Sequence, residues 1–230
     1  MRHGSERTNP ATVPTLPPSP APSSTSLPRG SRGSRTRAFR ALSEEIRGCT
    51  LCPLAQGRTQ AVVYRGSLRP NVVFVGEAPG AEEDRQGIPF VGRSGRLLDR
   101  AIADLGPALG EYGVLNVIKC RPPRNRFDPR AARACRPYLD RQLDLLRPRV
   151  LVPLGARAWT ALAPRAPPIL QAAGSPRPGP DAWLFPLIHP AAALRSRRWH
   201  ERWDRDVLAL GGWLAQAGCN AITRPRLERT

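Results

Sequence analysis

Apolar residues occur along this chain with two periods, and together they predict alternating strands and helices. Four short apolar runs predict strands, and they lie at residues 72–75, 113–120, 150–154 and 183–188. Apolar residues at helical spacing predict helices between and after these runs, at residues 97–105, 135–146, 156–163 and 199–214. This order indicates an α/β fold with a small parallel sheet of about four strands and helices on both faces.

The two ends of the chain have a different composition from the middle. Residues 1–36 are rich in Pro, Ser, Thr and Arg and show no apolar periodicity, so we expect a disordered basic tail. Residues 220–230 are expected to be frayed, which leaves a single domain at 37–219. Within that domain, residues 164–180 hold many Pro and Gly residues and are expected to form a loop.

The net charge of the chain indicates what kind of partner it binds. The chain has 36 Lys and Arg residues against 18 Asp and Glu, a formal net charge of +18. Such an excess favours a polyanionic partner, most often nucleic acid, although a merely basic surface is an alternative. No apolar run approaches the roughly 18 residues of a membrane span, and the N-terminus lacks the apolar core of a signal peptide. We therefore expect a cytoplasmic protein with no membrane contact.

Four of the five cysteines form a pattern typical of a metal site. Cys49 and Cys52 make a Cys-x2-Cys pair, and Cys120 and Cys135 add two thiols from the predicted domain. Four thiolates suit either a tetrahedral zinc ion or a [4Fe–4S] cluster, and the spacing alone does not choose between them. Four unrelated buried cysteines are the structural alternative. Cys219 lies outside the pattern, and we expect it to have no ligand role.

Several short motifs, taken together and in order, resemble those of the family 4 uracil-DNA glycosylases. They are GEAPG at 76–80, PFVG at 89–92, NVIKCRPP at 116–123 and HP at 189–190. The resemblance runs from about residue 47 to 214. It implies a three-layer α/β/α sandwich, removal of uracil from DNA in base excision repair, and a monomeric enzyme associated with the bacterial nucleoid. It also implies a [4Fe–4S] cluster on Cys49, Cys52, Cys120 and Cys135.

Three residues are candidates for recognising a flipped uracil. Phe90 is placed to stack on the uracil ring. The alternative is that Phe90 is an apolar core residue of the PFVG turn. Asn116 follows the second strand, and its carboxamide complements the O4 and N3–H edge of uracil, whereas cytosine presents the reversed pattern. His189 follows the fourth strand and, as a neutral imidazole, would donate to uracil O2 as negative charge develops there.

The remaining candidates act on the sugar and the DNA backbone. Glu77 is the preferred residue for positioning water or stabilising the sugar cation, with Glu83 and Asp84 as alternatives. Gly76 is expected to allow close approach of the DNA backbone. Arg195 resembles the family's minor-groove residue, which fills the space behind the flipped base, although a solvated charge run is an alternative.

Two other functions compete with uracil excision. The same basic surface and cysteines would suit a non-catalytic, metal-stabilised DNA-binding module. A glycosylase for another deaminated base would use the same pocket with a different shape. The presence together of Glu77, Phe90, Asn116 and His189 argues against the first alternative, and Asn116 favours uracil over other bases.

Overall fold

The computed structural model describes residues 32–218 and Ile222, and residues 1–31, 219–221 and 223–230 lie outside that description. A six-stranded sheet has the order β1-β3-β2-β4-β6-β5. Its strands are β1 (Arg65–Gly66), β2 (Val72–Gly76), β3 (Tyr112–Asn116), β4 (Val150–Pro153), β5 (Arg177–Pro178) and β6 (Trp183–Leu184). The four inner strands are parallel and the two edge strands are antiparallel.

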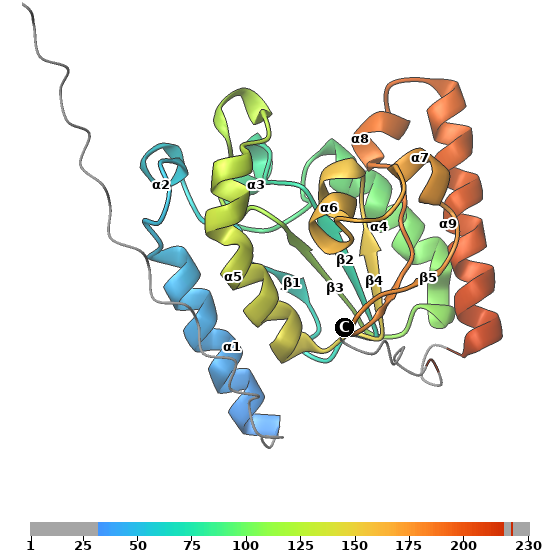
Figure 1. Ribbon diagram of the computed structural model, residues 1–230, viewed down its shortest axis with the longest axis horizontal. Coiled ribbons are helices and arrows are strands. Elements are labelled where there is room, and N and C mark those ends of the chain that lie inside the picture. The colour runs from blue at the N-terminus through green and yellow to red at the C-terminus, as the bar shows by residue number, and fades with distance from the viewer. Residues whose placement is uncertain (1–31, 219–221, 223–230) are drawn as a thin grey trace, which may run out of the picture.

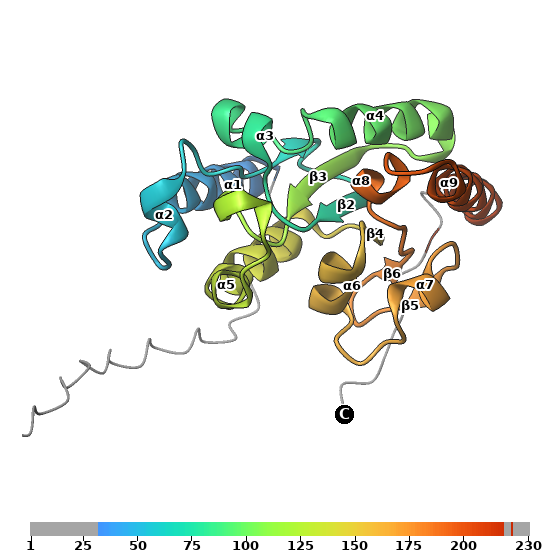
Figure 2. The same cartoon turned by 90° about the horizontal axis from the view of Figure 1, so that it is seen from above.

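Helices cover both faces of this sheet, as Figures 1 and 2 show. They are α1 (Arg32–Arg47), α2 (Leu54–Gly57), α3 (Ala81–Gln86), α4 (Arg93–Leu105), α5 (Pro129–Leu146), α6 (Ala156–Leu162), α7 (Ile169–Ala172), α8 (Pro190–Ala193) and α9 (Arg197–Ala217), with 3-10 turns η1 (Gly106–Ala108) and η2 (Pro123–Asn125). The predicted three-layer α/β/α sandwich is confirmed. The sheet is larger than predicted, because the two-residue edge strands are too short to leave a pattern in the sequence.

Alternate residues of the central strand β2 build two separate cores. Val72 and Phe74 pack in one apolar cluster with residues of α4 and α9, including Leu98 and Trp203. Val73 and Val75 pack in the other cluster, with residues of α5 and α6. All five residues of β2 are buried, which explains why the strand reads as a continuous apolar run rather than an alternating one.

Several predicted boundaries were wrong. The second strand ends at Asn116 rather than at 120, although Val117 N and Ile118 N still donate to the carbonyls of Gly76 and Glu77. The fourth strand is only two residues long, although Phe185 N and Leu187 N still donate to the carbonyls of Leu151 and Pro153. The segment 164–180 is not only a loop, because it contains α7 and β5.

The structure describes residues within both of the expected tails. Helix α1 starts at Arg32, so residues 32–36 are helical; the last proline before this helix is Pro28, and nothing after it prevents a helix. At the other end, Ile222 is only 5% exposed, and its carbonyl accepts a 2.6 Å hydrogen bond from Arg149 Nη1. This residue of the expected frayed end is therefore docked on the domain. The prediction for Cys219 falls outside the described residues.

No helix within the described part of the chain has the length and apolar character needed to cross a bilayer.

Helix α5 is held at its start by a side-chain cap, which generates a stability prediction. The Asp128 carboxylate accepts from Arg130 N at 2.8 Å and from Ala131 N at 3.3 Å. We expect Asp128→Ala to lower the free energy of unfolding by about 1 kcal/mol, because two helix amides lose their acceptor. Urea denaturation measures this change, and Asp128→Asn is the control that should retain most of the stability.

Candidate functional site

The candidate site lies at the carboxyl edge of the parallel strands, where open α/β sheets place their ligands. Gly76 of β2 pairs with Asn116 of β3 at this edge. The chain continues the pairing briefly, since Val117 N donates to Gly76 O at 2.9 Å and Ile118 N to Glu77 O at 3.0 Å. The sheet register thus brings two motifs forty residues apart in the sequence against each other.

Gly76 makes room for two side chains of the site. A Cβ atom at this position would lie 2.3 Å from Asn116 Oδ1 and 2.5 Å from the Phe90 ring atoms Cε2 and Cζ. These distances are far below van der Waals contact, so only glycine fits. The structure gives a reason for this glycine in addition to the expected close approach of DNA: the absence of a Cβ atom lets the Asn116 amide and the Phe90 ring lie against the same point of the backbone.

Phe90 is held in an unusual backbone conformation beside His189. Its φ angle is 56°, in the left-handed region that non-glycine residues rarely adopt. The ring is 5% exposed, and its centroid lies 6.0 Å from that of the His189 imidazole, with 31° between the planes. The two predicted ring-bearing residues are therefore neighbours at this edge of the sheet.

Asn116 carries an unsatisfied polar atom. The residue is 1% exposed, and its Oδ1 has no hydrogen-bond partner among the described residues. An unpaired buried carbonyl costs about 1–3 kcal/mol, so a ligand donor is the natural explanation for its retention. Lys119 Nζ donates to the backbone carbonyl of Asn116 at 2.5 Å and fixes the main chain at this point.

His189 is oriented as a neutral hydrogen-bond donor. Its Nδ1 accepts from Ala191 N at 3.1 Å, so in the neutral ring the hydrogen is on Nε2. Burial of the ring, together with the charge of Arg195, lowers the pKa of His189 to about 4, and Glu83 opposes the shift. At neutral pH the imidazole therefore has a hydrogen to donate and no positive charge.

Glu77 directly follows β2 and is half-buried. Burial raises the pKa of its carboxyl above the ordinary value, and the charge of Arg157 partly opposes this. Arg157 lies at the start of α6, with its guanidinium 4.9 Å from the centroid of the Phe127 ring. No sequence motif pointed to Arg157, because it approaches Glu77 only through the parallel pairing of β2 and β4.

The four patterned cysteines also come together. Cys120 and Cys135 are each 4% exposed, while Cys49 and Cys52 are partly buried near the end of α1 and the start of α2. Arg58 Nη1 donates to Cys120 Sγ at 3.1 Å, and the charges of Cys49 and Cys52 act on Cys120. Among the residues that the structure describes, no three Cys, His or acidic side chains are close enough to hold one metal ion.

Comparison with known proteins agrees with this arrangement. The family model described as the uracil DNA glycosylase superfamily matches residues 63–209. The chain belongs to this superfamily. It is 39% identical to the type-4 uracil-DNA glycosylase of Thermotoga maritima over 171 residues, which is 71% of this chain and 87% of that protein. It is also 39% identical to the type-4 uracil-DNA glycosylase of Pyrobaculum aerophilum over 183 residues, 75% of this chain and 93% of that one.

A type-5 uracil-DNA glycosylase matches a shorter part of this chain. The type-5 uracil-DNA glycosylase of Pyrobaculum aerophilum is 33% identical over 112 residues, 42% of this chain and 50% of that protein. The longer matches to type-4 proteins confirm the resemblance to family 4 that the motifs predicted.

Both acids that were predicted as alternatives to Glu77 accept hydrogen bonds from backbone amides. Glu83 Oε1 accepts from Val91 N at 3.0 Å and Gly92 N at 2.8 Å, and Oε2 accepts from Gly80 N at 3.0 Å. Asp84 is 6% exposed and accepts from Thr59 N at 3.0 Å. Glu83 thus ties the loop after β2 to the turn that contains Phe90, a role that the sequence did not reveal.

The arginine that was predicted to face DNA lies near His189. Arg195 is exposed between α8 and α9, and its charge acts on His189, so the two residues are close. The neighbouring arginines have partners on α9: Arg197 pairs with Glu201 at 2.8 Å, and Arg198 lies over the Trp199 ring at 5.8 Å. A surface ion pair of this kind contributes little and exchanges easily for a phosphate.

The Glu83 contacts give a prediction about local stability. In Glu83→Gln, an NH₂ group replaces one carboxylate oxygen and faces a backbone N–H, so at least one charge-assisted hydrogen bond is lost. The NH₂ group faces either Gly80 N or the pair Val91 N and Gly92 N, and we expect hydrogen exchange at the amides it faces to become roughly ten- to hundredfold faster. Glu82→Gln makes the same chemical change one residue earlier, on the surface, and should leave all three amides unchanged. Equal exchange in the two variants would contradict the role of Glu83.

Proposed function

We propose that this protein is a DNA-repair glycosylase that hydrolyses the N-glycosidic bond of uracil in DNA and leaves an abasic site. The observation that carries the proposal is the unpaired, buried Oδ1 of Asn116, which lies near the Phe90 ring, and this ring in turn neighbours the His189 imidazole. The relatives described above are named uracil-DNA glycosylases and match most of the chain, which supports the same reaction.

Base selection follows from the chemistry of the Asn116 carboxamide. Uracil presents an N3–H donor beside its O4 acceptor, so Asn116 Oδ1 would accept from N3 while Nδ2 donates to O4. Cytosine presents an acceptor and a donor in the reverse order. Binding cytosine would therefore leave Oδ1 unsatisfied and face two donors against each other. Phe90 would stack on the flipped ring and hold it in this register.

Bond cleavage requires stabilisation of two developing charges. The departing uracil becomes an anion, and His189 Nε2–H would donate a hydrogen bond to its O2. Because the imidazole is neutral, it would stabilise the anion by this hydrogen bond and would not act as an acid that protonates it. The sugar becomes an oxocarbenium-like cation, for which the Glu77 carboxylate supplies negative charge and an acceptor for the attacking water. Because burial raises the pKa of Glu77, this carboxylate also becomes a better base for that water.

DNA binding would use the basic surface around the pocket. Arg195 is exposed next to His189, where it can enter the minor groove and occupy the space left by the flipped base. The net charge of +18 supports a large salt-dependent contribution to DNA affinity.

The four cysteines fit a [4Fe–4S] cluster. Such a cluster binds each cysteine to a different iron, so its four sulfurs stand farther apart than those around one zinc ion. Two buried and two partly buried thiols that influence one another, with Arg58 donating to Cys120, suit that arrangement. The group would tie α1 and α2 to the segment that carries Asn116 and to α5, and the hydrolysis needs no electron transfer.

The competing functions are less well supported. A DNA-binding module without activity would have no use for a buried amide that lacks a partner, since replacing it with an apolar residue would stabilise the fold. A glycosylase for another deaminated base would be distinguished by the damaged base that it removes from DNA.

The reaction is tested with duplex oligonucleotides that contain one uracil, using protein purified without oxygen and alkali to break the abasic site. We expect strand cleavage at uracil opposite guanine or adenine, and none when thymine or cytosine replaces uracil. Cleavage at a different damaged base would support the second alternative. Tight DNA binding with no cleavage of any substrate would support the non-catalytic module.

His189 is tested by substitution and by pH. We expect His189→Ala to lower the single-turnover excision rate roughly 10²–10³-fold, because one donor to the leaving anion is lost, while duplex affinity changes much less. The neutral imidazole is the active form and its pKa is about 4, so its contribution should persist as pH falls through 6.5 and disappear near pH 4. The Glu77→Gln variant removes the other side chain of the site whose protonation would lower the excision rate in acid. An inflection near pH 6.5 in the excision rate of that variant would contradict the assignment of a pKa of about 4 to His189.

The cluster is tested by composition and stability. We expect the natural protein to be brown and to contain about four iron and four sulfide ions per chain. Cys135→Ser should lose iron and lower the melting temperature, whereas Cys219→Ser, outside the ligand pattern, is the control that should retain both. A colourless protein with one zinc ion per chain would overturn the cluster in favour of the zinc site that the cysteine spacing also allows.

A further inference from the structure

A cavity of about 460 Å³ lies between the exposed side of α4 and the connection from α8 to α9. Three of its five described lining residues are arginines, and the full lining is Arg93, Arg96, Asp99, Arg100 and Leu194. The first four of these belong to α4, and Leu194 follows α8. Neither the candidate site nor the cysteine site uses any of them.

The spacing of the three arginines places them on one side of α4. Residues three and four apart are neighbours on a helix surface, so Arg93, Arg96 and Arg100 form a single row, which we call the α4 arginine row. The helix turns another side to the core, through Leu97, Leu98, Ala101 and Leu105. All three arginines are therefore exposed, and at about 1.5 Å per residue the row is about 10 Å long.

The acidic side chains next to the row are paired with other arginines. Asp99 Oδ1 accepts a 2.6 Å hydrogen bond from Arg65 Nη2 of β1. Glu82 of α3 pairs with Arg85 at 2.7 Å, and the charge of Arg96 acts on it more weakly. Across the residues that the structure describes, no member of the row has a carboxylate oxygen within 4.0 Å of its guanidinium. The row therefore presents positive charge to solvent, which favours an anionic ligand.

One end of the row adjoins the candidate site. A Cβ atom at Gly95 would clash with the Phe90 carbonyl, so the first turn of α4 packs directly on the turn that holds Phe90. Across the cavity, Leu194 precedes Arg195, whose charge acts on His189. The two walls of the cavity thus belong to the segments that follow Phe90 and His189.

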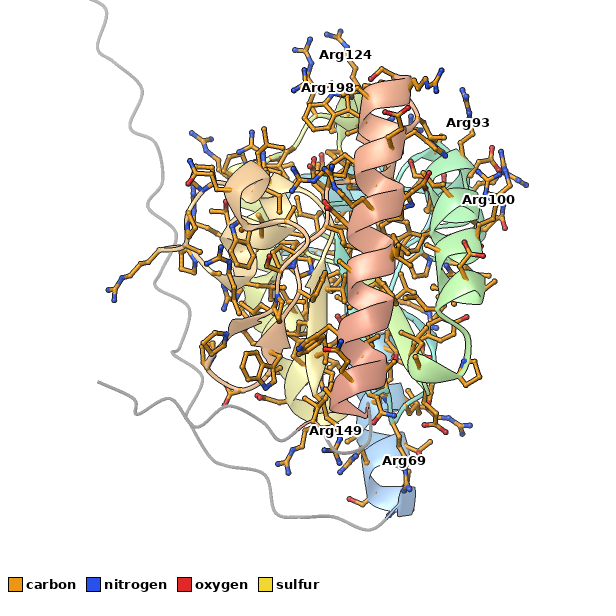
Figure 3. All side chains as sticks on the ribbon, turned by 90° about the vertical axis from the view of Figure 1, so that its right-hand side faces the viewer. Arg69, Arg93, Arg100, Arg124, Arg149 and Arg198 are labelled. Atoms are coloured by element: carbon orange, nitrogen blue, oxygen red, sulfur yellow. The ribbon has the colours of Figure 1, made fainter. Side chains whose placement is uncertain are left out.

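The row then leads away from the candidate site along α4. In Figure 3, Arg93 lies near the upper end of this helix, and Arg100 lies below it on the same helix. Successive phosphates of one DNA strand advance about 3.4 Å along the duplex axis, so a row of about 10 Å matches about three of them. A strand that leaves the candidate site on this side would lie along the row.

We propose that Arg93, Arg96 and Arg100 bind successive backbone phosphates of one DNA strand, on one side of the flipped nucleotide. Guanidinium–phosphate contacts read no sequence, but they fix the position and direction of the duplex on the protein. The row would hold only one arm of the duplex, because it begins at the candidate site and extends in one direction. The inference rests on the proposed function, since it takes uracil-containing DNA as the ligand.

The row is tested by the affinity of the full chain for a duplex whose uracil nucleotide carries a 2′-fluorine, which destabilises the sugar cation and prevents cleavage. Arg96→Gln/Arg100→Gln should bind roughly tenfold more weakly than the natural protein, and its slope of log K against log salt should be shallower by about two. Arg37→Gln/Arg40→Gln removes the same charge from α1, which packs against α5, and should bind like the natural protein. Arg96→Lys/Arg100→Lys keeps the charge and should retain most of the affinity, which controls for misfolding.

The place of the contacts is tested with methylphosphonate linkages, which remove the charge of a phosphate without shortening the duplex. About six successive linkages are neutralised on either side of the uracil and in either strand, which gives four modified duplexes. We expect the natural protein and the Arg96→Gln/Arg100→Gln variant to bind equally to one of the four and to keep their roughly tenfold difference on the other three. A difference that is absent on the unmodified duplex, or that is removed by none or by more than one of the modifications, overturns the inference.

Excision is measured separately, on a uracil duplex without the fluorine, so that the two proposals fail in different ways. Absence of excision by the natural protein would overturn the proposed reaction. Excision by the natural protein together with one of the overturning binding results would leave the reaction standing and remove only the role of the α4 arginine row.

Discussion

The arrangement of the candidate site at the carboxyl edge depends on the absence of a side chain at residue 76. The space that a Cβ atom would fill is occupied by the Asn116 amide on one side and the Phe90 ring on the other. Gly76 is also the last residue of the central strand and pairs directly with Asn116, so the sheet register determines where the amide stands. A shift of one residue between β2 and β3 would turn every side chain of one strand to the other face and dismantle the pocket.

The cysteine group and the base pocket share one stretch of chain. Asn116 and Cys120 lie four residues apart, and Lys119 between them is 1% exposed. Its ammonium donates to the Asn116 carbonyl, and the charges of Cys120 and Cys135 act on it. A buried ammonium needs nearby negative charge, which thiolates provide and apolar neighbours do not. The position of the Asn116 amide is therefore linked to the state of the cysteines.

The sequence predicted two kinds of feature: elements with a regular apolar period, and site residues that lie in short contiguous motifs. The parallel strands and most of the long helices followed from apolar periodicity, and the pocket residues followed from four short motifs. The sequence did not reveal contacts between segments far apart, such as Glu83 with the turn after Phe90, or Arg157 near Glu77. These contacts depend on side-chain directions that are fixed only after the strands pair. The edge strands were missed because two residues show no period.

The left-handed backbone at Phe90 has a consequence for how this protein can change. A phenylalanine with a φ angle of 56° carries about 1–3 kcal/mol of strain, which a glycine or asparagine there would release. The ring nevertheless stays in place because it is 5% exposed and packs in the same apolar cluster as Phe74 and Leu97. Truncating a buried phenylalanine costs about 3–5 kcal/mol, which exceeds the strain that a glycine or asparagine would release. A search for thermostable variants would therefore retain the disfavoured backbone at this residue, because the buried aromatic ring more than offsets it.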